Sequence, residues 1–199
     1  MKRMSSAALI DPSYRVPFGP TGDTGMAGLR ALVVRFSEGE AHQRRRSVTE
    51  AVIAEISDAR FVETPTRALS AAFGLPAELE NDVALVAAAY LPHARQSAES
   101  DAAADRLLAA CGGRDERSAA RACVLVQAHA ATSSWVSLLR AGSNAPPIPA
   151  TRRIGPDGSE VEVMLDDARF GHGSHRCPGE ALGRRLTDEA VSSPLSQRK

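Results

Sequence analysis

Lysine and aromatic residues are scarce in this 199-residue sequence, and neither sign of charge is in excess. Lysine occurs only as Lys2 and Lys199, so arginine supplies the other positive charges. The 24 basic and 24 acidic residues balance, which excludes a global field that would recruit nucleic acid or an anionic membrane. Aromatic residues make up 4%, so alanine and small aliphatic residues must fill the core, which favours closely packed helices.

The sequence also lacks paired cysteines and long apolar runs. Cys111, Cys123 and Cys177 are odd in number and far apart, which argues against a disulfide framework and for a reducing compartment. Near the N-terminus the apolar stretch is only Ala7–Ile10, too short for a signal peptide or a membrane span. The expectation is a soluble, cytoplasmic protein with no membrane partner.

The pattern of helix signals predicts a mainly α fold. Residues 1–36 are rich in glycine and proline, so we expect an irregular N-terminal segment. We expect one domain over 37–190 and a flexible tail over 191–199. Ser37 and Glu40 form a capping box that predicts a helix starting near residue 38. The further expected elements are a short helix after Pro65, helices over 77–91 and 97–110 parted by Pro92, a hairpin from Ile154 to Leu165, and a short helix over 180–190.

The longest uninterrupted helical pattern covers residues 115–140. Its middle, from Ala119 to Leu139, is apolar nearly all round, which is typical of a helix buried through the core. Gly142 provides the stop signal after it. The prediction is therefore a long central helix around which the other helices pack.

One glycine-rich loop, residues 170–179, carries a cysteine whose setting suits metal ligation. Its glycines allow the backbone to turn tightly and to approach a flat partner. A helix follows Cys177, so its first amides and the neighbouring His175 and Arg176 are expected to favour a thiolate.

This loop resembles the haem-ligand signature of the cytochromes P450. The matching residues are Phe170, Gly173, Cys177 and Gly179, and His175 fits the family position that meets a haem propionate. The resemblance implies heme b (iron protoporphyrin IX) as cofactor, with Cys177 as the axial ligand of the iron. It also implies a monooxygenase or peroxide-driven oxygenation of a small organic substrate.

Other segments resemble the same family at lower specificity. His42 and Arg46 lie four residues apart, on one face of a helix, like the family pair that binds haem propionates. Pro146-Pro147-Ile148-Pro149 precedes Arg152 and Arg153, and the resemblance implies that Arg152, or else Arg153, binds a propionate too. A basic face formed by Arg176, Arg184 and Arg185 would suit an acidic ferredoxin-type electron donor.

The central helix departs from the family where oxygen chemistry is expected. Ala128-His129-Ala130-Ala131-Thr132-Ser133 aligns with the family pattern Gly-His-Glu-Thr-Thr-Ser. Ala130 and Ala131 stand where the resemblance requires an acid and an alcohol, and neither can carry a proton. His129 and Thr132 are the remaining candidates for catalytic roles, and hydrogen peroxide, which arrives with its protons, is the oxidant that this pattern favours.

A second departure concerns the family's Glu-x-x-Arg, because no glutamate in this sequence has an arginine three residues later. The sequence therefore resembles an abbreviated P450-like fold with a long central helix, a small β-hairpin and a haem-ligand cysteine loop. Two alternatives remain open. One is a degenerate member that binds haem or a partner without turnover, and the other is a zinc site formed by His172, His175 and Cys177.

Overall fold

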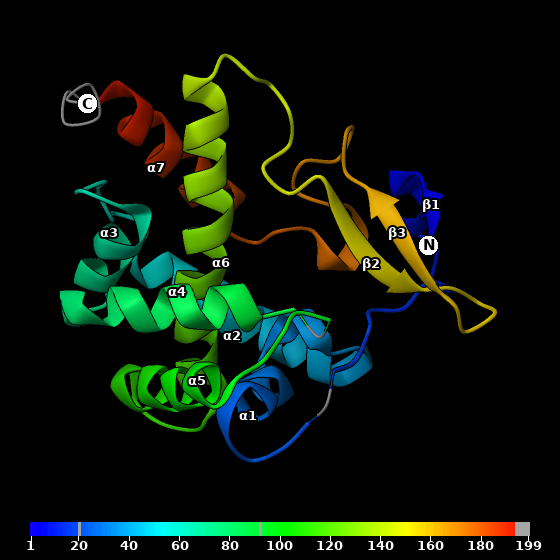
Figure 1. Ribbon diagram of the computed structural model, residues 1–199, viewed down its shortest axis with the longest axis horizontal. Helices are drawn as coiled ribbons and strands as arrows, with labels where there is room; N and C mark the ends of the chain where they lie inside the picture. Colours follow the sequence, from blue (N-terminus) through cyan, green and yellow to red (C-terminus); the bar gives the residue numbers. More distant parts are fainter. Residues whose placement is uncertain (20, 92, 194–199) are drawn as a thin grey trace.

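The computed structural model describes residues 1–19, 21–91 and 93–193, and it is mainly helical (Figure 1). Pro92 and residues 194–199 of the predicted tail lie outside the described residues. The α-helices are α1 (Gly25–Leu32), α2 (Gly39–Glu55), α3 (Pro65–Ala72), α4 (Glu80–Ala89), α5 (Ala98–Cys111), α6 (Glu116–Arg140) and α7 (Glu180–Ser192). The strands are β1 (Lys2–Met4), β2 (Ala150–Ile154) and β3 (Glu160–Met164), and short 3₁₀ turns lie at Ser6–Leu9, Val34–Phe36, Ala77–Leu79 and Gly173–His175.

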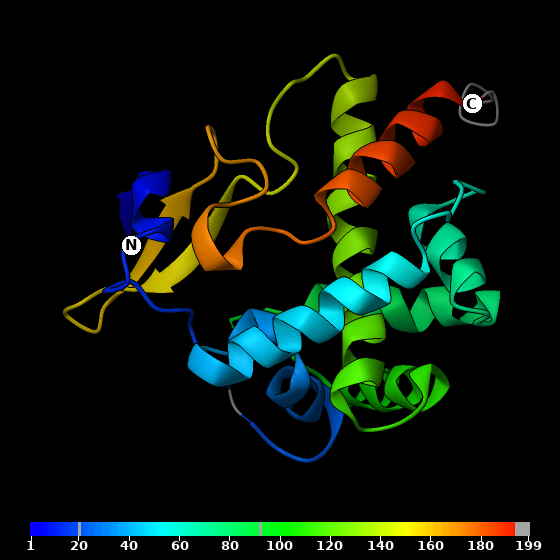
Figure 2. The same ribbon diagram turned by 180° about the vertical axis from the view of Figure 1, so that it is seen from behind.

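The long helix α6 confirms the predicted central helix. Asp115 caps its first turn by accepting hydrogen bonds from the amides of Arg117 and Ser118, both at 2.9 Å. Gly142, at φ 71°, follows its last turn. Both ends are thus determined by local residues. Helices α1 to α5 and α7 all pack against α6, which forms the axis of the helical body (Figures 1 and 2).

The prediction that α6 is buried all round is wrong for its second half. Its first half, from Ser118 to Val126, is largely buried, whereas Gln127, Ala130 and Ser133 are exposed in the second half. These residues are spaced by three, so they share one face of the helix. One 18-residue window of α6 has a mean hydropathy of 1.3, enough to span a membrane by composition, but a single such helix is weak evidence because core helices pass the same test.

The expected hairpin is confirmed and belongs to a three-stranded sheet of order β1-β3-β2. β2 runs antiparallel to β3, and β1 joins the other edge of β3 in parallel, with Lys2 opposite Val161. Strand β1 was not predicted, because three residues are too few to show an alternating pattern. The sheet has its own small apolar core, separate from that of the helices. Figure 1 shows the sheet to one side of α6.

The prediction of an irregular segment over residues 1–36 holds for residues 11–19 and 21–24, which carry no helix or strand, but is wrong for the rest. Besides β1, this segment contains α1, whose Met26 and Leu29 have no exposed surface. The amides of Gly25 and Met26 donate to the carboxylates of Asp105 and Asp101 on α5. Thr24 stands at the N-cap position but forms no side-chain cap, so the start of α1 depends on these contacts with a distant helix.

The start of α2 differs from the predicted capping box. Glu38 is the N-cap and gives no side-chain cap, while the Ser37 hydroxyl donates to the carbonyl of Val34 at 2.9 Å. Ser37 therefore ends the turn at Val34–Phe36 and does not cap α2. The Glu38 carboxylate accepts a hydrogen bond from the amide of Val16. At the other end of the chain, α7 continues to Ser192, past the predicted boundary at residue 190.

Candidate functional site

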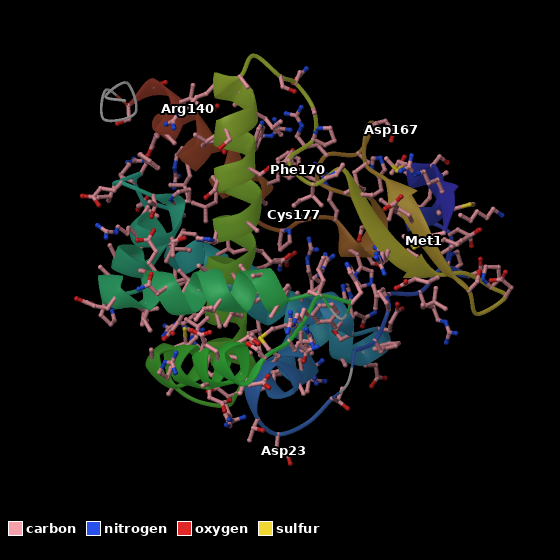
Figure 3. All side chains as sticks on the ribbon, viewed as in Figure 1. Met1, Asp23, Arg140, Asp167, Phe170 and Cys177 are labelled. Atoms are coloured by element: carbon pink, nitrogen blue, oxygen red, sulfur yellow. The ribbon has the colours of Figure 1, made fainter. Side chains whose placement is uncertain are left out.

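The cysteine loop connects β3 to α7 and passes beside α6, with Phe170 and Cys177 labelled on it in Figure 3. Gly171 and Gly173 adopt φ values of 71° and 66°, which favour glycine over other residues. A Cβ on Gly173 would also stand 3.1 Å from the carbonyl oxygen of Leu9. The turn closes when the Cys177 amide donates to the carbonyl of Phe170 at 2.8 Å. The backbone thus sets the place of Cys177, three residues before α7 begins.

Cys177 is an exposed residue that belongs to no disulfide, although its sulfur is partly desolvated by the surrounding loop. Desolvation by the packed loop raises its pKa, although the Gly179 amide and the Arg46 and Arg176 guanidinium groups act in the opposite direction. The expectation that the loop alone favours a thiolate is therefore wrong, because desolvation outweighs the nearby positive charge. A metal ion that coordinates such a thiol would itself remove the proton.

Helix α2 brings His42 and Arg46 onto the cysteine loop. The ring centroids of His42 and His175 lie 4.1 Å apart. Arg46 donates to the carbonyl oxygens of Ser174, at 3.4 Å, and Arg176, and it pairs with Glu50 on its own helix at 2.6 Å. Residues that are more than a hundred positions apart in the sequence therefore form one cluster, as their resemblance to propionate-binding residues requires.

Strand β2 directs Arg153, rather than Arg152, toward this cluster. Arg152 pairs with Glu160 on the neighbouring strand at 2.8 Å, whereas Arg153 is 7% exposed and lowers the pKa of His175 through its charge. Successive residues of a strand point to opposite faces, so only one of the two arginines can face the loop. Arg35, which precedes α2, also acts on His175 and was missed by the sequence reasoning.

This cluster holds positive charge with little acidic compensation. Within the described residues, neither Arg35 nor Arg153 has an Asp or Glu within ion-pair distance. Desolvation, with Arg35 close by, lowers the pKa of Arg153 to about 10, so the group remains charged at neutral pH. The Nε2 atom of the buried His42 has no hydrogen-bond partner among the described residues. Unpaired buried donors and charges are costly, and an anionic group such as a propionate would satisfy them. The residues present therefore fit the propionate groups of a haem.

Both histidines of the cluster are neutral at physiological pH. Desolvation lowers the pKa of His175 to about 3, helped by His42, Arg153, Arg35 and Arg46. Desolvation and the charge of Arg46 likewise lower the pKa of His42, against the opposing effect of Glu38. Neutral imidazoles can donate or accept hydrogen bonds without adding charge to the arginines.

The lowered pKa of His42 predicts a pH-dependent stability of the haem-free protein. Below pH 6.5 this histidine is protonated in the unfolded chain, whereas its lowered pKa keeps it neutral in the folded chain to a lower pH. The unfolding free energy therefore falls as the pH falls. The slope contributed by one such group is at most about 1.4 kcal/mol per pH unit. Urea unfolding between pH 7 and 5 measures the summed slope, to which His175 also contributes because its pKa is lowered to about 3, so His42→Asn should reduce the slope without removing it. An equal change for His172→Asn, at an exposed position of the same loop, would contradict the assignment.

The two candidates for distal chemistry lie away from the exposed face of α6. His129 Nδ1 is hydrogen-bonded to the hydroxyl of Thr66 on α3 at 2.8 Å, and Thr132 is 4% exposed. The two residues are three apart and share this face. Ser134, on another face, donates to the carbonyl of Pro147 in the segment that leads to β2. Among the described residues, no hydrogen bond joins His129 or Thr132 to Cys177, so their distal roles remain predictions.

The remaining sequence-based assignments concern charges and metals. Arg176 and Arg184 both pair with Glu180, at 2.6 and 2.9 Å, so the predicted basic face is partly neutralised. In the part of the chain that the structure describes, no three His, Cys, Asp or Glu residues are grouped to hold a metal ion, which leaves the zinc alternative without a ligand set.

Comparison with solved structures finds cytochromes P450. P450BioI in complex with an acyl carrier protein ligated to hexadec-9Z-enoic acid matches with a TM-score of 0.69 and 16% identity, over 97% of this chain and 83% of that chain. Epothilone D-bound P450epoK matches with a TM-score of 0.65 and 15% identity, over 96% and 81%. CYP105P1 in complex with filipin I matches with a TM-score of 0.56 and 16% identity, over 97% and 79%. No known family profile and no curated protein sequence matches.

Proposed function

Because this chain has the cytochrome P450 fold in a shortened form, we propose that it is a haem-thiolate protein that oxygenates a small organic substrate in the cytoplasm. The observation that carries the proposal is the convergence of the Cys177 loop with His42, Arg153 and His175, a cluster poor in acidic partners. Three free cysteines support a reducing compartment.

Each part of the site has a role in this proposal. Cys177 would ligate the haem iron through Sγ, and the Gly179 amide beside it would stabilise negative charge on the sulfur. Arg153, Arg46 and the Nε2 atom of His42 would hold the propionates. When bound, a haem iron with a thiolate ligand supplies oxidising chemistry in which electron donation from sulfur favours O–O cleavage. Arg152, which is paired with Glu160, remains a predicted propionate ligand of lower rank.

Small residues on α6 support peroxide as the oxidant. Ala130 is exposed and Ala131 half-buried, and neither side chain can hold or move a proton. His129 is engaged with Thr66, on another face of the helix. An oxidant that brings its own protons does not need a helix acid, whereas dioxygen with an external reductant does. A ferredoxin-type donor is therefore the less favoured partner.

We expect at least about tenfold more product from styrene or indole with hydrogen peroxide than with a reductant system and dioxygen, since one correctly placed proton donor contributes on the order of a hundredfold. The double substitution Ala130→Glu and Ala131→Thr restores an acid and an alcohol, and it should raise dioxygen-dependent turnover relative to peroxide. Product analysis by chromatography measures both reactions. Turnover with reductant and dioxygen but none with peroxide would exclude this oxidant.

The spectrum of the purified protein tests the proposal as a whole. After haem addition and reduction, carbon monoxide should produce the long-wavelength band that is typical of thiolate ligation. A protein that stays colourless in the presence of haem contradicts the proposal. Binding of haem with the shorter-wavelength band would instead mean that Cys177 does not ligate the iron.

A second candidate function is haem binding without turnover. Two observations favour it: the sequence has no Glu-x-x-Arg, and Ala130 and Ala131 stand where the family has an acid and an alcohol. A thiolate-type spectrum without product from either oxidant would support this function over oxygenation.

A further inference from the structure

The single tryptophan of the chain, Trp135, joins the central helix to the cysteine loop. It lies on α6, is 7% exposed, and contacts the ring of Phe170 edge to face, with centroids 5.6 Å apart and an interplanar angle of 67°. This is a favourable geometry for two aromatic rings. Phe170 belongs to the glycine-rich signature, whereas no motif in the sequence singled out Trp135.

Two arginines complete the contact. The guanidinium of Arg184, on α7, lies 4.7 Å from the Phe170 ring centroid and 5.8 Å from that of Trp135. Arg169 lies 5.1 Å from the Trp135 ring centroid. All three distances are in the range of cation–π attraction. We refer to Trp135, Phe170, Arg169 and Arg184 as the ring cluster.

The two arginines are themselves anchored. Arg184 donates to the Glu180 carboxylate from Nε and Nη2, at 3.1 and 2.9 Å. Arg169 donates from Nη2 to the backbone and side-chain oxygens of Asn144, at 2.7 and 2.9 Å, in the segment that follows α6. The ring cluster therefore ties together α6, the segment after it, the start of the cysteine loop and α7.

The backbone of Phe170 links this cluster to Cys177. Its carbonyl accepts the amide of Cys177, so the residue whose ring is held by Trp135 also holds the cysteine. The Nε1 atom of Trp135 is buried, and no residue that the structure describes forms a hydrogen bond with it. A tryptophan that forms no hydrogen bond through its ring nitrogen contributes through its ring alone.

We propose that the ring cluster fixes the Cys177 loop against α6, in place of the Glu-x-x-Arg ion pair that this sequence lacks, with Trp135 as the positioning residue. Its consequence for haem ligation rests on the proposed function, but the positioning itself is a property of the haem-free chain. The failure of one can therefore be told from the failure of the other.

Amide hydrogen exchange of the haem-free protein, resolved on peptides that cover residues 171–177, tests the proposal. Trp135→Leu should raise exchange at Cys177 by about tenfold, since an aromatic pair and two cation–π contacts are lost. Trp135→Phe keeps a ring and loses no hydrogen bond, so it should restore most of the protection. Recovery with phenylalanine separates the ring contact from burial of an apolar side chain.

Phe73→Leu is the matched control, because Phe73 also forms a cation–π contact. The Arg121 guanidinium lies 5.7 Å from the centroid of the Phe73 ring. This variant should leave loop exchange unchanged when compared at equal global stability, as measured by urea unfolding. Equal loop exchange in the Trp135→Leu and Phe73→Leu variants would overturn the proposal. So would full protection in Trp135→Leu.

Arg184→Gln provides a second test if Trp135→Leu does not fold, since Arg184 is largely exposed. It should speed loop exchange, while Arg176→Gln, which removes the other partner of Glu180, should not. With haem added, Trp135→Leu should lower the thiolate-ligated fraction in the carbon monoxide spectrum. Changed loop exchange in a protein that binds no haem would support the ring cluster and refute the proposed function.

Discussion

Replacing Cys177 by alanine is expected to abolish the thiolate-type carbon monoxide band while the protein still folds. The residue is exposed and forms no disulfide, so removal of its thiol should change the unfolding free energy by no more than about 0.5 kcal/mol. The loop backbone should persist, because its hydrogen bond to Phe170 comes from the amide of residue 177 and not from the sulfur. The measurement is the reduced, carbon monoxide-treated spectrum of both proteins after haem titration.

Cys111 provides the matched control for this experiment. It is a buried free cysteine in α5, and desolvation raises its pKa to about 12, so it is poorly suited to ligate a metal. Cys111→Ala should keep the band, at some cost in stability from the lost packing. A band that survives in Cys177→Ala would mean that another residue ligates the iron.

Replacing Arg153 by methionine should have opposite effects on the haem-free and haem-bound protein. In the haem-free protein this buried guanidinium has hydrogen bonds to Thr151 and to the carbonyl of Arg152, but no ion pair with a described residue. Removing a desolvated charge in favour of a packed apolar side chain should stabilise the fold by about 1–2 kcal/mol. The same change removes a charged donor for a propionate and should weaken haem affinity by about tenfold or more.

Arg152→Met is the neighbouring control for this pair of effects. Arg152 forms a partly exposed ion pair with Glu160, and such pairs contribute about 0–1 kcal/mol. Urea unfolding and haem titration of the two variants give both quantities. If the loss of affinity followed Arg152 rather than Arg153, the orientation of strand β2 toward the site would have no bearing on haem binding.

Local rules explain the features that were predictable from the sequence. The Asp115 cap and Gly142 delimit α6, and the spacing of Phe170, Gly173 and Cys177 marks a loop whose glycines adopt positive φ. Each of these features depends on residues within one or two turns of the chain. The hairpin between β2 and β3 is local for the same reason.

The sequence by itself determined the long helix, the hairpin and the cysteine loop, because their hydrogen bonds close between near neighbours. Only the tertiary structure decided which arginine of β2 faces the loop, that His129 meets Thr66, and that Trp135 holds Phe170. These contacts join distant segments and depend on how helices and strands rotate when their apolar faces pack. A rotation by one residue turns a side chain by about 100° on a helix and to the opposite face on a strand. For this reason, the residues beside Cys177 could be named only once the helices and strands were packed.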